Sequence, residues 1–412
     1  MIEKTPAASP AASGRHWPLA ALIASLAMLG PFSIDAYLPA FGAIRSEFDI
    51  PQIAIQQTLS TYLLAYAGMM LWHGALSDAI GRRPVVIGSL CVFAVATLGC
   101  AIAGNIQTLW LFRALQGLSA GAPLVVGRAI IRDRFQGPEA QRLMSQVTLI
   151  FGVAPAIAPV IGGILLNTIG WRSIFWLLLL LTLAMLVWTF RALPETLPAS
   201  ARQPLHPRDL WRNYRTVASR LDFVLLAFVP ALNFSAFFLY IAIAPAYLVR
   251  LLGVSTYGFA WLFIPMIAGI MVGALASGRL AGRFSATRTV RLGYMFAFAG
   301  VVLNLAIVAT VPPGVPWHVL PVFVFCIGSA IIMPTVTLLL LDPFPAMRGL
   351  ASSLQGFIHF SLSALNAGTI APFLSDSLWT LALGMAAFTG ASYIVWLIYL
   401  QRRRPAIEAL HP

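Results

Sequence analysis

One acidic residue, Asp35, lies in an apolar stretch, Gly30-Pro-Phe-Ser-Ile-Asp-Ala-Tyr-Leu-Pro39, whereas the other acidic residues lie in polar segments or at the ends of apolar runs. A carboxylate surrounded by apolar sequence is energetically costly and is a functional candidate by default. Its chemistry would be the uptake and release of a proton. The alternative is an interfacial Asp35 that contacts water at a frayed helix end near Pro39.

A basic residue, Arg113, lies about two helical turns into another apolar run, at a depth similar to that of Asp35. A nearby opposite charge favours an ionised carboxylate, while removal from water favours the neutral form. A carboxyl group held between these two effects is suited to proton exchange. We therefore predict that Asp35 and Arg113 couple to protons, with a static buried ion pair as the alternative.

We found no sequence pattern for an enzyme, a metal site or a cofactor. The stretch Gly117-Leu-Ser-Ala-Gly121 matches the nucleophile pattern GxSxG, but that pattern requires a strand before the serine. Here it lies inside an apolar run, so we interpret the two glycines as small residues that allow close helix packing. No HExxH, Walker A or GxGxxG pattern occurs.

The elements that must position these residues are apolar helices. Of the 412 residues, 59% are apolar and 9% are charged, whereas soluble domains carry about 25% charged residues. Twelve membrane-spanning helices of ~20 residues would need ~240 apolar residues, close to the number present. We predict an all-α polytopic membrane protein with twelve transmembrane helices in two six-helix halves. The expected spans are 17–41, 54–76, 85–103, 107–131, 144–166, 172–193, 222–248, 257–278, 290–311, 317–341, 350–373 and 377–400.

The polar segments and their charges define the domains and the orientation. The arginines concentrate in alternate connections, and segments rich in basic residues stay in the cytoplasm. The net charge of +13 is thus explained by a lipid bilayer partner, without nucleic acid. We expect both termini in the cytoplasm. The predicted parts are a cytoplasmic tail (1–16), an N-terminal half (17–193), a cytoplasmic linker (194–221), a C-terminal half (222–400) and a second tail (401–412).

Small and polar residues inside the spans suggest packing sites and a binding cavity. The fifth span carries Pro155, Pro159, Gly162 and Gly163, which favour a hinge and a close contact between the halves. General enrichment of glycine and proline in membrane helices is the alternative. Aromatic rings with a few polar groups suit a cavity for an amphipathic small molecule. The binding candidates are Tyr37, Gln57, Tyr62, Asn233, Phe237, Tyr240, Gln355 and His359.

Several of these segments resemble the major facilitator superfamily. The stretch Gly74-Ala-Leu-Ser-Asp-Ala-Ile-Gly-Arg-Arg-Pro84 is similar to the signature of its loop after helix 2. Arg113-Ala-Leu-Gln-Gly-Leu-Ser-Ala-Gly121 is similar to its helix 4 signature, and Ala158-Pro-Val-Ile-Gly-Gly163 to its antiporter signature, although members usually carry Gly in place of Ala158. The segment ending at Pro39 resembles the Bcr/CflA subgroup of drug:proton antiporters.

The resemblance implies a proton-coupled exporter of small, partly apolar drugs in a bacterial inner membrane, working by alternating access and as a monomer. Asp35 would bind the proton and Arg113 would be its partner. A conformational gate would be formed by Gly74, Asp78, Gly81, Arg82 and Arg83, in which the glycines allow a tight turn. The alternative function is export or import of a physiological metabolite by the same fold.

Overall fold

The computed structural model describes residues 17–135, 137–255, 258–280 and 283–408. Within these residues the chain forms helices and no strand. The α-helices are α1 (Trp17–Asp35), α2 (Phe41–Phe48), α3 (Gln52–Ile80), α4 (Arg82–Ala101), α5 (Ile106–Ala120), α6 (Ala122–Arg134), α7 (Gly137–Thr168), α8 (Arg172–Ala192), α9 (Pro207–Ala218), α10 (Leu221–Ala242), α11 (Ala260–Leu280), α12 (Ala286–Thr310), α13 (Leu320–Leu341), α14 (Arg348–Leu365), α15 (Ala371–Leu374) and α16 (Leu378–Glu408). Short helical turns, η2 (Leu38–Ala40) to η6 (Asn366–Ile370), connect some of them.

The helices have the length and composition of membrane spans. Among the described residues, ten helical segments are long and apolar enough to cross a membrane, and α7 adds a shorter apolar stretch, Pro155–Thr168. Helix α3 has 29 residues, which at 1.5 Å per residue is long enough to cross, but polar residues such as Gln56 and His73 lower its hydropathy. Each of the twelve expected spans falls on one of these segments, so the predicted fold class is confirmed.

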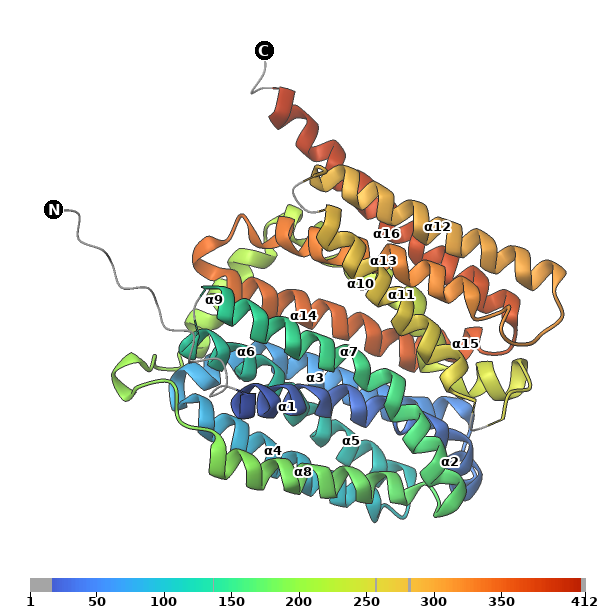
Figure 1. Ribbon diagram of the computed structural model, residues 1–412, viewed down its shortest axis with the longest axis horizontal. Helices are drawn as coiled ribbons and strands as arrows, with labels where there is room; N and C mark the ends of the chain where they lie inside the picture. Colours follow the sequence, from blue (N-terminus) through green and yellow to red (C-terminus); the bar gives the residue numbers. More distant parts are fainter. Residues whose placement is uncertain (1–16, 136, 256–257, 281–282, 409–412) are drawn as a thin grey trace.

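The helices form two groups that lie side by side (Figure 1). Helices α1 to α8 pack among themselves, and α10 to α16 pack among themselves. Helix α3 meets α14, and α7 meets α11, across the boundary between the first group and the second group. The bundle has a linker end, which carries α9, and a far end, which carries α2 and α15 (Figure 1).

Breaks in the first and the fourth span were not predicted by the sequence analysis. Helix α1 ends at Asp35, and the chain passes through a turn and η2 before α2 begins at Phe41. Pro39 lies in η2 and has no N–H group to donate to a continuing helix. Gly121 likewise separates α5 from α6, and Pro123 follows at the start of α6.

The linker contains a helix where the sequence analysis expected only a polar stretch. Helix α9 is amphipathic: Tyr214 and Val217 are buried on one face, while Trp211 on the other face is 71% exposed. The Tyr214 hydroxyl donates to the backbone carbonyl of Leu71 in α3, at 2.8 Å. Because α9 also packs on α10 and α14, the linker contacts both helix groups.

Candidate functional site

Asp35 is the last residue of α1, at the interruption of the first span. Its side chain is buried with the residue only 5% exposed, and within the described part of the chain no hydrogen bond or ion pair reaches its carboxyl group. The carbonyl groups at the end of a helix carry partial negative charge. A buried charge without a partner is costly, so binding a proton at this position removes that cost.

Arg113 of α5 is fully buried, in an environment of aromatic rings. Its guanidinium lies over the rings of Tyr62 and Tyr37, at 4.3 Å and 4.9 Å from their centroids. It donates to the side-chain oxygen of Gln116 at 2.7 Å and to the carbonyl of Ser33 at 3.3 Å. Its Nε and Nη2 atoms have no acceptor among the described residues. The side chain is therefore a buried cation that retains two unused donors.

The two predicted proton-coupling residues do not form an ion pair in this conformation. Among the described residues, the contacts of Arg113 are those to Gln116, Ser33 and the two tyrosine rings. Tyr62 interacts with both charges: the Arg113 guanidinium lies over its ring, and its hydroxyl interacts electrostatically with Arg113 and Asp35. The role of the pair in proton coupling stays a prediction, and Tyr62 is the residue that links its members here.

The glycine and proline segment of α7 packs against the interrupted part of the first span. A Cβ atom on Gly162 would lie 2.0 Å from the carbonyl oxygen of Ala36, which is directly after Asp35. Gly162 thus makes its close contact inside the first group. The sequence analysis expected this contact between the two halves, and the structure does not show it there. Pro155, Pro159 and Gly163 lie on the same helix, which reaches the second group through α11.

At the linker end, the predicted gate residues form a network around Arg82. Its guanidinium donates to Asp78, to the hydroxyl of Ser77 at 2.6 Å and to Asp133 at 3.1 Å. Asp133 was not among the predicted site residues, because it lies 51 positions from Arg82 in the sequence. Two carboxylates sharing one guanidinium fix the α3–α4 turn against the end of α6.

The linker joins this network through Glu195, which sequence analysis did not assign to the site. The Glu195 carboxylate accepts hydrogen bonds from the backbone N–H groups of Arg82 and Arg83, at 3.0 Å and 3.3 Å. These groups open helix α4, where a negative charge is favourable. Gly81 has a φ of +108°, and a Cβ atom there would lie 2.4 Å from the Glu195 carboxylate. Only glycine therefore fits this turn.

The other two gate residues have different surroundings from those expected. Gly74 lies inside α3, and an added Cβ atom would only touch Val125 at 4.0 Å, so the tight turn involves Gly81 alone. Arg83 donates to the carbonyl of Phe190 in α8 at 2.7 Å and lies over its ring. None of these gate contacts within the described residues reaches the second group.

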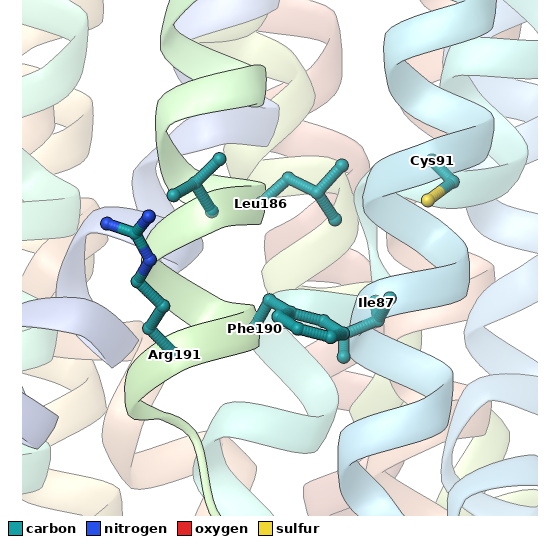
Figure 2. Close-up of a pocket in the computed structure, with 6 residues that line it drawn as sticks. Ile87, Cys91, Leu186, Phe190 and Arg191 are labelled. Atoms are coloured by element: carbon teal, nitrogen blue, oxygen red, sulfur yellow. The ribbon is translucent and has the colours of Figure 1, made fainter.

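A shallow apolar groove lies beside Arg83, between α4 and α8 (Figure 2). Ile87 and Cys91 line it from α4, and Leu186, Phe190 and Arg191 line it from α8 (Figure 2). It holds none of the predicted site residues. Its apolar lining suits lipid chains better than a polar substrate.

Most predicted binding residues are engaged in contacts within their own helix group. Tyr37 donates to Thr58 at 3.1 Å, Asn233 donates to Ser392 at 2.8 Å, and Tyr240 accepts from Asn304 at 2.6 Å. Gln57 instead donates to the carbonyl of Gly368 at 2.8 Å and so connects the two groups near the far end. The Gln355 side chain donates to Thr337 at 3.0 Å.

A chain of aromatic rings crosses the boundary between the two groups. Tyr66 of α3 contacts Phe360 of α14, with ring centroids 4.6 Å apart. Phe360 is next to His359, whose ring is 4.3 Å from that of Phe234 in α10, and Phe234 contacts Phe237 at 4.7 Å. We call Tyr66, Phe360, His359, Phe234 and Phe237 the aromatic bridge. It places two predicted binding residues, Phe237 and His359, next to a surface from the first group.

The comparison with known proteins decides the family. Residues 23–367 match the Major Facilitator Superfamily. The chain belongs to this superfamily. It is 25% identical over 378 residues to a bicyclomycin resistance protein homolog of Haemophilus influenzae, covering 92% of this chain and 94% of that protein. It is 26% identical over 392 residues to the multidrug resistance protein MdtL of Escherichia coli, covering 94% and 97%.

Other relatives agree with this assignment. An uncharacterized MFS-type transporter of Bacillus subtilis, YdgK, is 30% identical over 384 residues, covering 90% of this chain and 94% of that protein. The solved structure of a D-xylose-proton symporter superposes with a TM-score of 0.73 at 15% identity, covering 92% and 97% of the two chains. The protein is therefore a multi-pass membrane transporter and not an enzyme, and its relatives support the predicted drug-resistance subgroup.

Proposed function

We propose that this transporter exports small, partly apolar drugs from a bacterial cell in exchange for protons, by alternating access across the inner membrane. The observation that carries the proposal is the buried and unpartnered Asp35 carboxyl group at a break in the first span. The names of its relatives, a bicyclomycin resistance protein homolog and a multidrug resistance protein, support drugs as the substrate class.

Proton binding and substrate binding would alternate at neighbouring places. Asp35 holds a proton when its surroundings are apolar, and it loses the proton when water or a cation comes within reach. We assign the partner role in this step to Arg113, a buried cation with two donor atoms that have no acceptor among the described residues. Tyr62 interacts electrostatically with both groups, so a shift of its hydroxyl would change the electrostatic potential at each of them.

The energy of one proton is sufficient for useful export. One charge that crosses 100 mV supplies about 2.3 kcal/mol. At about 1.4 kcal/mol for each factor of ten, one proton per neutral drug molecule sustains a drug gradient of roughly 40- to 50-fold. Asp35 alone would thus account for the coupling.

We also propose that both termini are cytoplasmic and that the linker end of the bundle faces the cytoplasm. The arginines Arg82, Arg83 and Arg134 lie at this end, as does α9 with its exposed Arg208 and Arg212. Reporter fusions at the C-terminus and at an opposite-side loop such as residues 312–316 would test this orientation. Activity of a cytoplasmic reporter at the loop would contradict it.

Everted membrane vesicles test the function directly. Respiring vesicles from cells that express the protein should accumulate bicyclomycin, and an uncoupler should release it. Addition of bicyclomycin to energised vesicles should also dissipate part of the pH gradient, which a pH-sensitive dye reports. Vesicles from cells with an empty vector are the control. If the drug accumulates in the presence of the uncoupler, or if no drug in a panel moves protons, the proposal is wrong.

A further inference from the structure

A second intramembrane cation, Arg128, is not explained by proton coupling or by the gate. It lies in α6, six residues before the end of that helix, inside a segment that is apolar enough to span the membrane. Six residues correspond to about 9 Å along a helix axis. Within the described part of the chain no hydrogen bond or ion pair holds its guanidinium, and its side chain is exposed.

The position of Arg128 on α6 places it on the face that meets α3, the helix that in turn meets α14 of the second group. Gly121 and Val125 lie on the side of the chain that meets α3, since an added Cβ at Gly121 would lie 3.4 Å from the Tyr66 ring and Val125 lies beside Gly74. Residue 128 follows 121 by seven and 125 by three, so it shares their face. A helical side chain leans toward the start of its helix, and Arg128 accordingly interacts electrostatically with Tyr66.

Among the described residues, no acidic side chain at this end of the bundle pairs with Arg128. Asp78 and Asp133 both bind Arg82, and the charged neighbour that acts on Arg128 is a second cation, Arg132. An uncompensated guanidinium at membrane depth is costly unless it contacts water or an anion. Arginine also has the planar donor geometry that matches a carboxylate with two parallel hydrogen bonds.

We propose that Arg128 binds the carboxylate of an amphipathic substrate whose apolar part lies on the aromatic bridge. Tyr66 belongs to that bridge and interacts electrostatically with Arg128. Phe360, whose ring contacts that of Tyr66, and Phe234 are only partly buried, so the bridge offers apolar surface beyond Tyr66. The inference rests on the proposed export function and makes it more specific: acidic aromatic compounds are favoured, and permanently cationic ones are disfavoured by Arg128 and Arg132.

Three probes with the same aromatic body test this assignment: 1-naphthylacetate, its methyl ester and the (1-naphthylmethyl)trimethylammonium ion. Isothermal titration of the full-length protein in detergent measures their affinities. A hydrogen bond to a charged group typically corresponds to a factor of about ten to a hundred in affinity. We expect the carboxylate to bind most tightly, and Arg128→Gln to weaken it by that factor while the ester changes less than about threefold.

Two further variants complete the test. Arg128→Lys keeps the charge without the planar donors, so it should retain part of the preference for the carboxylate. Arg134→Gln, at the exposed end of the same helix, is the matched control and should leave all three affinities unchanged. The proposal is overturned if the wild-type protein binds the ester or the ammonium ion at least as tightly, binds none of the probes, or keeps its preference in Arg128→Gln. Proton-driven bicyclomycin export by the wild-type protein is measured separately, so failure of the export function is distinguishable from failure of this site.

Discussion

Replacement of Asp35 by asparagine tests proton binding at this position separately from protein stability. The amide has nearly the shape of the carboxyl group but does not titrate. Because no described residue donates to or pairs with the Asp35 carboxyl group, the substitution removes no hydrogen bond and no ion pair. We therefore expect the free energy of unfolding to change by less than about 1 kcal/mol, the typical contribution of one hydrogen bond.

The effect on transport should be much larger. If Asp35 carries the coupled proton, Asp35→Asn loses the whole contribution of the membrane potential, about 2.3 kcal/mol per 100 mV for each charge. The drug gradient that everted vesicles sustain should then fall from roughly 40- to 50-fold to about onefold. Addition of drug should no longer move protons. Exchange of labelled drug for unlabelled drug across the membrane should continue, because it needs no net proton movement.

The matched control is another acidic residue of the same span. Glu47 in α2 accepts from the indole of Trp171 at 2.6 Å and pairs with Arg172 at 2.7 Å. Its neutral variant Glu47→Gln should lower stability slightly and leave the drug gradient intact. A gradient that persists in Asp35→Asn, or that collapses equally in both variants, would refute the assignment of Asp35.

Three further substitutions test the packing around the site. Gly162→Ala should cost about 1–3 kcal/mol of stability, the usual range for overpacking, whereas Gly88→Ala, which has open space, should be neutral; equal melting temperatures would contradict the close contact. Glu195→Gln should speed tryptic cleavage of the linker after Arg202, and an unchanged rate would show that the carboxylate does not hold this segment. Tyr214→Phe should lower stability by about 1 kcal/mol through loss of one hydrogen bond, and a thermal unfolding curve like that of the wild type would argue against this link.

The spans could be predicted from the sequence because membrane helices must be long, apolar and internally hydrogen-bonded. The pattern of apolar runs therefore has few alternative interpretations. The interpretation of Gly117 and Gly121 as packing residues is also confirmed. A Cβ at Gly117 would lie 2.1 Å from the carbonyl of Tyr62, and one at Gly121 would lie 3.3 Å from His73. Small residues indicate a close approach even before the partner helix is known.

The contacts between distant segments could not be predicted in the same way. Glu195 lies 113 positions from the N–H group of Arg82 that it binds, and a short polar segment gives no signal for its partner. The apolar pattern also hides interruptions, because a chain that turns at Pro39 remains apolar throughout. Arg128 was overlooked as an embedded charge because it lies close to the arginines of the next connection, Arg132 and Arg134. The expected span 107–131 already contained Arg128, and the structure shows that α6 continues beyond it to Arg134.

The interruption after Asp35 has a consequence for how a proton could move helices. The backbone of a residue in the middle of a straight helix is held by hydrogen bonds to the turns before and after it. Such a residue therefore moves only with the whole helix. Residues 36–40 instead follow a turn and a short 3₁₀ helix. The carbonyl of Ala36 in this segment lies against Gly162 of α7, and α7 also packs on α11 of the second group. If Asp35 binds the coupled proton as we propose, its change of charge would act on this segment, and α7 connects the segment to α11 of the second group.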